Sequence, residues 1–210
     1  MECSAARIIG IMRHRLMTDG DGVTTLVAFH GCPLRCRYCL NPQSLVSPER
    51  HGVYTAEQLY EATKIDELYF LATGGGVTFG GGEPALHPEF ISRFRELCGA
   101  EWHLTLETSL NVPQVNIETL IPLVDSWIID IKDMNPEIYK GYTGVDNSQV
   151  LSNLNLLSDA SCQADCTIRL PHIPGHNTGH DQYESRRSLS ALGFAKFDQF
   201  TYKITKSLKL

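Results

Sequence analysis

The sequence predicts an α/β fold, a partial (βα)6 TIM-like barrel that is open on one side. Short apolar, β-branched segments alternate with helical patterns six times along the chain. Strands of this kind are typical of a parallel sheet covered by crossover helices. A closed barrel of eight units usually takes about 250 residues, whereas this chain has 210. Six units therefore favour an open barrel, and an open doubly wound sheet is the alternative.

Six segments are predicted to be strands because they are short, apolar and rich in β-branched or aromatic residues. In chain order they are residues 24–29, 77–79, 102–107, 126–131, 166–170 and 199–204. They are too short and too apolar for an antiparallel sheet with one face in solvent, so a parallel sheet is expected.

Helix signals lie between these strands. Thr55 is followed three residues later by Gln58, which predicts a capping box at a helix start. Pro88 occupies a favourable first helical position, and the apolar residues after it recur on one face until Gly99, a typical helix stop. A later helix is expected to end at Gly193.

Composition and charge argue against several classes of protein. With 42% hydrophobic and 20% charged residues the chain fits a globular fold, and without repeats or linkers we expect a single domain over residues 1–210. No apolar run reaches about 18 residues and no signal peptide is recognisable, so no membrane partner is expected. The net charge of −6 argues against nucleic-acid binding. Seven cysteines, an odd number, indicate a reducing, cytoplasmic setting.

Unusual polar residues follow the predicted strands. They are Cys32, Cys36 and Cys39 after the first strand, Gly80–Glu83 after the second, Glu107, Thr108 and Ser109 after the third, Asp130 and Lys132 at the fourth, and Arg169 at the fifth. Because the carboxyl ends of parallel strands share one edge of the sheet, these groups are expected to meet in one active site.

The three cysteines on one short loop have the spacing C-x-x-x-C-x-x-C. Structural zinc takes four ligands, so His30 as a fourth ligand would give a His/Cys zinc site. Iron–sulfur clusters are held by thiolates, usually four for a [4Fe–4S] cluster. Three protein thiolates would leave one iron open to another ligand, which makes sense if that iron takes part in chemistry.

This spacing after a first strand, with the aromatic Tyr38 before the last cysteine, resembles the radical S-adenosylmethionine superfamily. The segment GGGVTFGGGEP at 74–84 is similar to one branch, the activating enzymes of glycyl radical enzymes, and so are residues 130–157 and 168–177. Few residues separate Cys39 from the helix start at Thr55, so the chain resembles the short subclass without a ferredoxin-like insert.

The resemblance implies an oxygen-sensitive oxidoreductase with a [4Fe–4S] cluster and S-adenosylmethionine as cofactors. In that family S-adenosylmethionine is cleaved reductively, and a hydrogen atom is then abstracted from a glycine of a partner glycyl radical enzyme. A flavodoxin or ferredoxin is the implied electron donor.

The resemblance also implies roles for individual residues. The cluster ligands are Cys32, Cys36 and Cys39, and the residues near S-adenosylmethionine are Tyr38 and Asn41 on the adenine side, Gly81, Gly82 and Glu83 at the methionine end, and Lys132 and Arg169 near the carboxylate and ribose. Glycines there would let backbone approach the ligand. A possible monovalent cation site is Glu107, Thr108 and Asp130; the alternative is that these three bind neighbouring backbone.

Both ends of the chain depart from the family pattern. Asp21 replaces a proline and Thr24 an arginine in DGDGVT, and no histidine follows the last strand, where the family uses one to reach the ribose. The altered ends leave open a radical enzyme that acts on a small molecule or another peptide, and the missing histidine leaves open a degenerate, slow enzyme. A noncatalytic Cys/His metal-binding module is the alternative of another class.

Overall fold

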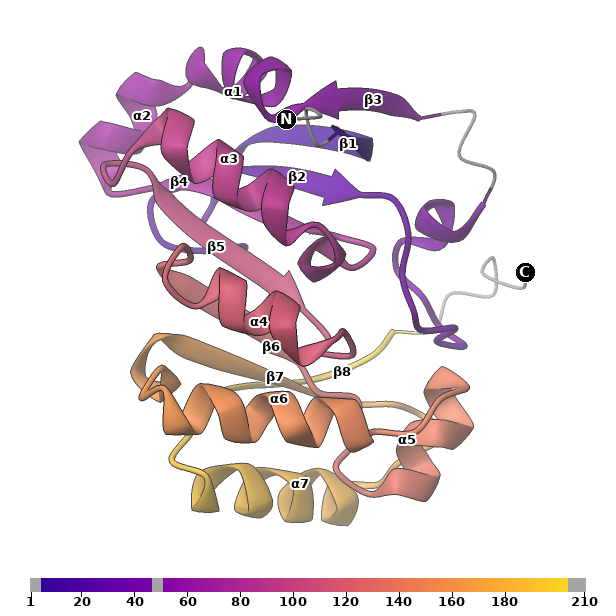
Figure 1. Cartoon of the computed structure of the whole chain (residues 1–210). Helices are drawn as coiled ribbons and strands as arrows, with labels where there is room; N and C mark the ends of the chain where they lie inside the picture. The colour runs from indigo at the N-terminus through magenta and orange to yellow at the C-terminus, as the bar shows by residue number, and fades with distance from the viewer. Residues whose placement is uncertain (1–4, 47–50, 204–210) are drawn as a thin grey trace.

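The computed structural model describes residues 5–46 and 51–203. They form one eight-stranded sheet in the order β3-β1-β2-β4-β5-β6-β7-β8 (Figure 1). The strands are β1 (Ala5–Leu16), β2 (Val23–Phe29), β3 (Gly52–Thr55), β4 (Gly76–Gly81), β5 (His103–Thr108), β6 (Ser126–Asp130), β7 (Cys166–His172) and β8 (Lys196–Thr201). The helices are α1 (Ala56–Lys64), α2 (Glu67–Thr73), α3 (Pro88–Cys98), α4 (Gln114–Leu120), α5 (Pro136–Thr143), α6 (Ser148–Asp159) and α7 (Gly179–Ala191).

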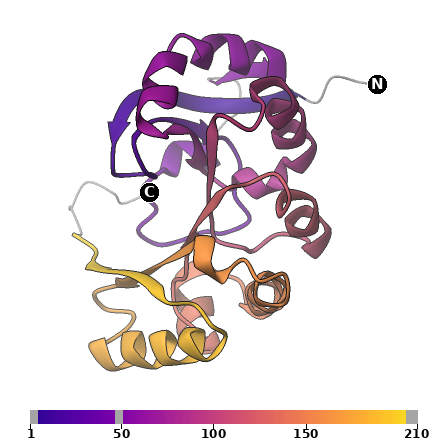
Figure 2. The same cartoon turned by 90° about the vertical axis from the view of Figure 1, so that its left-hand side faces the viewer.

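The six strands from β2 through β4 to β8 are parallel and follow one another in chain order. A doubly wound sheet would reverse the order of its parallel strands partway, and these six parallel strands do not reverse. The outer strands of the sheet, β3 and β8, lie at opposite edges, so the barrel is not closed. Figure 2 shows the helices following the outside of the curved sheet. The prediction of a partial six-unit barrel is confirmed.

The sequence analysis missed two strands. β1 pairs antiparallel with both β2 and β3, which extends the sheet beyond the first parallel strand. The pairing of β1 with β2 has two register shifts, and Arg13, His14 and Arg15 interrupt the apolar pattern of β1. The alternation of apolar and polar residues that is typical of a strand is therefore not recognisable in β1. The last predicted strand begins earlier than expected, at Lys196, and Ile204 lies outside the described residues.

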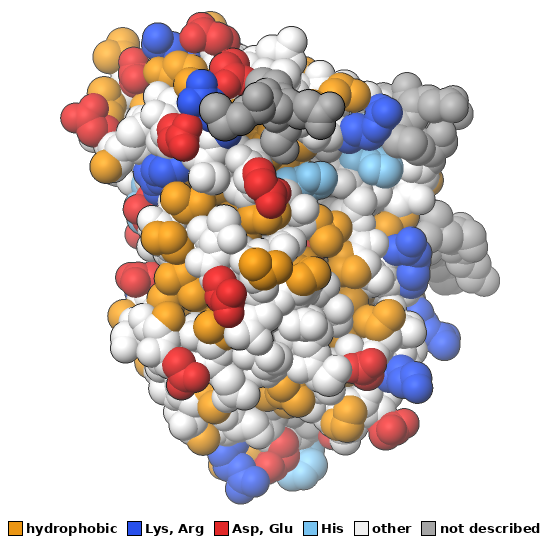
Figure 3. All heavy atoms as spheres, viewed as in Figure 1, with side chains coloured by type: hydrophobic (Ala, Val, Ile, Leu, Met, Phe, Trp, Pro, Cys, Tyr) orange, Lys and Arg blue, Asp and Glu red, His pale blue; other side chains and the backbone are white. Residues whose placement is uncertain are grey.

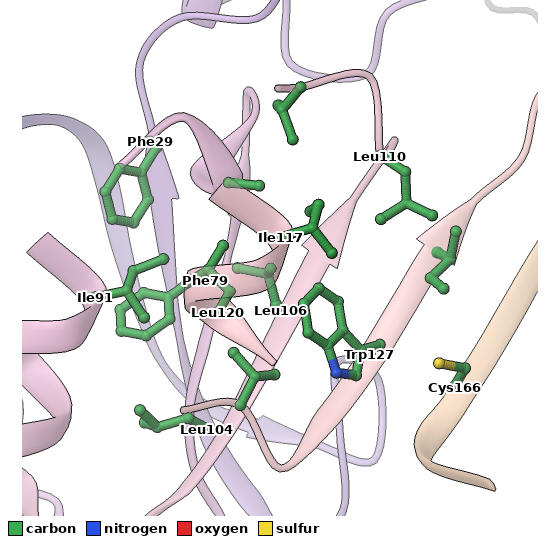
Figure 4. Close-up of a cluster of buried hydrophobic side chains, with 14 of the residues drawn as sticks. Phe29, Phe79, Ile91, Leu104, Leu106, Leu110, Ile117, Leu120, Trp127 and Cys166 are labelled. Carbon is green, nitrogen blue, oxygen red and sulfur yellow. The ribbon is translucent and has the colours of Figure 1, made fainter. Parts of the chain in front are cut away.

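The core lies between the parallel strands and the outer helices. Figure 4 shows Phe79, Leu104 and Leu106 of the sheet beside Ile91 of α3 and Ile117 of α4, and all five side chains are fully buried. Burying a side chain of this size contributes about 1.5–3 kcal/mol. The core thereby fixes the strands whose carboxyl ends carry the polar residues.

The predicted helix signals are confirmed. The Thr55 hydroxyl accepts from Gln58 N while Gln58 Oε1 accepts from Thr55 N, which is the capping box. Pro88 begins α3, and Gly99 ends it with a φ of +69°. In the part of the chain that the structure describes, no helix is long and apolar enough to span a bilayer. On the face shown in Figure 3, acidic and basic side chains are interspersed with apolar ones.

Candidate active site

A cavity lies at the carboxyl edge of the parallel strands. It encloses about 610 Å³, counting the part that opens to solvent. Its walls include most of the predicted site residues, namely Cys32, Cys36, Cys39, Tyr38, Asn41, Gly81, Gly82, Glu107, Thr108, Asp130 and Lys132. The expected convergence at one sheet edge is therefore observed. Glu83 and Arg169 are not part of the cavity wall.

The cysteine loop connects β2 to the short helix η1 (Pro42–Leu45). Its conformation is held by backbone hydrogen bonds to α5, from Arg35 N to Thr143 O at 2.9 Å and from Arg37 N to Tyr142 O at 3.2 Å. Because these bonds lie on either side of Cys36, α5 positions the loop directly. Helix α5 therefore places the central thiol at the cavity.

The three thiols face one cavity without forming a ready-made ligand set. Among the residues that the structure describes, no three His, Cys, Asp or Glu side chains are gathered closely enough to hold a metal ion. Burial raises the pKa of Cys32 to about 12 and that of Cys36 to about 11, so these thiols are neutral in the metal-free chain. A bound metal would stabilise the thiolates.

The donor set fits a cluster held by three protein thiolates. The cavity wall carries three cysteines, and neither a histidine nor a fourth cysteine belongs to it. The Nε2 atom of His30 lies 2.8 Å from the carbonyl oxygen of Val46, away from the cavity wall. A zinc site with His30 as the fourth ligand is therefore not supported by the arrangement of the loop.

Gly81 and Gly82 line the cavity and also allow close backbone packing. A Cβ on Gly82 would lie 2.1 Å from the carbonyl oxygen of Gly31, and one on Gly81 would lie 2.7 Å from Ala28. Gly81 also has a φ of +94°. Across the same corner, Asn41 Nδ2 donates to Gly81 O at 3.0 Å. The close approach of neighbouring backbone therefore requires glycine at both positions, whether or not a ligand is bound.

Glu83 lies behind the cavity wall and is fully buried. Its carboxylate accepts hydrogen bonds from the Thr108 hydroxyl at 2.6 Å and from both the amide and the hydroxyl of Ser109, at 2.9 and 2.6 Å. It also caps the short helix η3 (Pro84–Leu86) through Ala85 N. Burial raises the pKa of Glu83. Glu83 therefore ties the end of β4 to the end of β5 in this structure.

Glu107 and Arg169 form an ion pair beneath the cavity. Arg169 Nη1 lies 2.6 Å from Glu107 Oε1, and Arg169 Nη2 donates at 3.2 Å to Thr18 O in the β1–β2 turn. Arg169 thus faces a second hollow on the far side of the pair, which Thr18 and Asp198 also line. Burial raises the pKa of Glu107, although the Arg169 charge opposes this effect.

Asp130 and Lys132 form a second ion pair on the cavity wall. Burial is the largest single effect on the pKa of Lys132 and lowers it, but Asp130 and, to a lesser extent, Tyr202, Cys36 and Tyr142 together outweigh burial, so the pKa is raised. The Lys132 ammonium also donates to the Tyr202 hydroxyl at 3.0 Å. In the proposed cation set, Glu107 and Asp130 are thus balanced by Arg169 and Lys132.

Two tyrosines on the cavity wall, Tyr142 and Tyr202, were missed by sequence reasoning. Both belong to a small apolar cluster with Ile173 that packs against Cys36 and Tyr38. An aromatic residue near the end of a helix or strand is ordinarily a core residue, so local sequence carries no signal for this role. Only the approach of α5 and β8 to the cysteine loop reveals it.

Comparisons with known proteins agree with this geometry. The family model of the radical SAM superfamily matches residues 26–182. The chain is 29% identical to the (2S)-3-sulfopropanediol dehydratase activating enzyme of Klebsiella oxytoca, with 88% of this chain and 77% of that protein covered. It is 28% identical to the pyruvate formate-lyase 2-activating enzyme of Escherichia coli, with 95% and 80% covered.

The fold is also shared with solved structures. Streptococcus suis SuiB bound to S-adenosylmethionine superposes with a TM-score of 0.63 at 13% identity, over 87% of this chain and 43% of that one. At this identity the likeness concerns the fold alone. With a family model that spans β4 to β7 and the whole cysteine loop, the chain belongs to the radical SAM superfamily, whose members use a [4Fe–4S] cluster and S-adenosylmethionine.

Proposed function

We propose that this chain is an activating enzyme that abstracts a hydrogen atom from a backbone glycine of a partner glycyl radical enzyme. The observation that carries the proposal is the three-thiol loop facing a cavity at the carboxyl edge of the open barrel. The relatives support the choice of substrate, since they are activating enzymes of a dehydratase and of pyruvate formate-lyase. We further propose that residues 1–210 act as one domain in an oxygen-poor cytoplasm.

When bound, the cluster would supply one electron for the reductive cleavage of S-adenosylmethionine. The products are methionine and 5′-deoxyadenosine, and the latter carries the hydrogen atom removed from glycine. The protein's own task is to hold and orient these groups and to exclude water. Cys32, Cys36 and Cys39 would hold the cluster, because they are the only cysteines on the cavity wall in the described chain.

Around the thiols, other residues would shape the ligand site. Tyr38 and Asn41, both on the cysteine loop, would contact the adenine side, and Gly81 and Gly82 would offer backbone to the methionine end. Glu83 would act indirectly, because its carboxylate holds the β4 and β5 ends together behind the wall.

Charged residues would complete the site. Lys132 faces the cavity, whereas Arg169 would act from below through its ion pair with Glu107. A monovalent cation at Glu107, Thr108 and Asp130 stays a proposal. It requires the pairs with Arg169 and Lys132 to rearrange, and dependence of activity on K⁺ or Na⁺ would test it.

A small acidic one-electron carrier, a flavodoxin or a ferredoxin, is the proposed donor. Arg35 and Arg37 flank Cys36 and are both exposed. Figure 3 shows Lys and Arg side chains along its right-hand edge. In Figure 1, which has the same view, the arrowhead of β2 points toward that edge. A local positive surface on a chain of net charge −6 would attract an acidic donor to the cluster side.

The first experiment reconstitutes the chain anaerobically with iron and sulfide and adds reductant and S-adenosylmethionine. About four irons per chain and formation of 5′-deoxyadenosine are expected, and Cys36→Ala should abolish both. Cys162→Ala is the matched control, because this cysteine is not on the cavity wall.

A second step identifies the substrate. The loaded enzyme is mixed with pyruvate formate-lyase or with a sulfopropanediol dehydratase, the partners that the relatives' names indicate. A glycyl radical detected by electron paramagnetic resonance would support the proposal. Cleavage of S-adenosylmethionine with no radical on either protein would favour another substrate, and bound zinc without cleavage would favour a metal-binding module.

A further inference from the structure

Three side-chain rings from distant parts of the chain meet beside the cysteine loop. Tyr38 belongs to that loop, Tyr142 lies in α5, and His176 lies in the connection between β7 and α7. The ring centroids are 6.2 Å apart for Tyr38 and Tyr142, 5.8 Å for Tyr38 and His176, and 5.1 Å for Tyr142 and His176. All three distances lie in the range of direct ring contact. We call Tyr38, Tyr142 and His176 the three-ring cluster.

The members of the three-ring cluster differ in how firmly the fold holds them. Tyr142 is fully buried in α5, whereas Tyr38 is only half-buried and lies on an irregular loop. Both tyrosines line the cavity, and His176 does not. A half-buried side chain on a loop loses rotamer freedom when a ligand binds against it, and this loss weakens binding. A ring that already holds Tyr38 from outside the cavity would remove part of that cost.

Buried hydrogen bonds fix the turn that carries His176. The neighbouring Asn177 is 5% exposed, and its side-chain oxygen accepts from Ile173 N at 2.6 Å. Its side-chain amide donates to Pro171 O and to Asp133 Oδ2, both at 3.1 Å. His176 N also donates to Ile173 O at 3.0 Å. The backbone position of His176 is therefore set by the protein alone, and its ring can serve as a fixed support for Tyr38.

The geometry of the His176 ring is that of edge-on packing. Its plane makes an angle of 79° with the Tyr38 ring and of 70° with the Tyr142 ring, an arrangement that aromatic pairs favour. Burial and, to a lesser extent, the charge of Arg37 lower the pKa of His176, so the ring is uncharged at neutral pH. His176 thus contacts both tyrosines as a neutral ring, and a benzene ring in its place could make the same contacts.

We propose that His176 is a positioning residue for Tyr38. Its ring wedges Tyr38 against Tyr142 and so holds Tyr38 in the orientation in which it lines the cavity, before S-adenosylmethionine binds. Because His176 is not on the cavity wall, its effect on the ligand passes through Tyr38. The inference rests on the proposed function only in taking S-adenosylmethionine as the ligand, and it does not depend on the identity of the partner.

The test measures binding of S-adenosylmethionine to the reconstituted protein with its cluster oxidised, so that the ligand is bound but not cleaved. Equilibrium dialysis gives the affinity, and the iron content of each sample corrects it to the fraction of chains that carry a cluster. His176→Ala should weaken binding roughly threefold to tenfold, as expected for the loss of a ring contact. His176→Phe should restore most of the affinity, because phenylalanine keeps the ring and lacks only the nitrogens.

A double-mutant cycle tests whether the effect of His176 passes through Tyr38. Tyr38→Ala alone should weaken binding, and His176→Ala added to it should cause less than a roughly twofold further loss. His180→Ala is the matched control, because this histidine lies nearby at the start of α7 but is exposed and is not on the cavity wall. It should keep wild-type affinity. Circular dichroism of each variant checks that the fold is retained.

The outcomes separate this inference from the proposed function. Unchanged affinity in His176→Ala, or an undiminished effect of that change in the Tyr38→Ala background, overturns the inference even if a glycyl radical forms. Failure of His176→Phe to restore binding assigns the effect to the imidazole nitrogens and also overturns it. Binding that depends on the ring, without any glycyl radical, supports the inference and counts against the proposed partner. A wild-type protein that does not bind S-adenosylmethionine overturns both.

Discussion

Replacing Gly82 by alanine tests how the end of β4 supports the cysteine loop. The new Cβ would lie 2.1 Å from Gly31 O and 3.0 Å from Phe29 O, where ordinary contact is 3.4–4 Å. Both atoms are backbone and both already accept hydrogen bonds, from Glu83 N at 2.8 Å and from Gly82 N at 2.9 Å. The clash cannot be relieved by a side-chain rotation, so the backbone before Cys32 must move.

The expected loss of stability follows from these contacts. Overpacking of a closely packed site costs about 1–3 kcal/mol, and one backbone group left without its partner adds about 1–3 kcal/mol. Gly82→Ala should therefore lower the free energy of unfolding by about 2–6 kcal/mol. Because Gly31 precedes Cys32, the variant should also bind less iron on reconstitution.

Urea denaturation of the metal-free chain, followed by circular dichroism, measures the first effect, and iron per chain measures the second. Gly141→Ala is the matched control, since its Cβ would meet nothing within 4 Å in helix α5. This change should stabilise the protein by about 0.5–1 kcal/mol. A Gly82→Ala protein with wild-type stability and iron content would refute the reasoning.

Three further predictions concern other parts of the molecule. Asp66 is fully buried and its pKa is lowered, chiefly by the hydrogen bond from Arg13. Its stabilising effect is therefore present above the unfolded pKa of about 4 and is lost as the pH falls through the lower folded value. Asp66→Asn should cost about 1–3 kcal/mol at pH 7, and urea titrations should show this difference shrinking below about pH 4; a pH-independent difference would contradict it. Burial raises the pKa of Cys166 to about 12, so mass spectrometry should find it unlabelled by iodoacetamide at neutral pH until urea unfolds the chain; rapid labelling of the folded protein would show the thiol to be accessible. Replacing both Arg35 and Arg37 by glutamate should slow reduction of the cluster by an acidic donor in stopped-flow experiments and reduce the salt dependence of that rate. Reduction by dithionite is the control for an intact cluster. An unchanged rate with the acidic donor would mean that the donor binds elsewhere.

Much of the fold could be predicted because its signals are local. The β-branched runs and the caps at Thr55 and Gly99 depend on neighbours within a few residues, and the structure confirms them. Strand β1 could not be predicted in this way. Its pairing with β2 and β3 depends on register shifts that no short sequence pattern records.

The same distinction between local sequence signals and tertiary pairing applies to the candidate site. The spacing of Cys32, Cys36 and Cys39 is local information, and parallel topology then requires residues after successive strands to share one edge. The sequence by itself therefore determined the class of chemistry and the end of the barrel where it takes place.

Only the tertiary structure decided how the polar side chains pair. Glu83 is bound by Ser109, the residue directly after the next strand. Arg169 contacts Glu107 across 62 residues of chain, and Lys132 contacts Tyr202 across 70. These pairings depend on strand register and on how α5 and β8 approach the cysteine loop. A buried polar group takes whichever partner the packed neighbours bring within about 3 Å, and no spacing within the sequence specifies that distance.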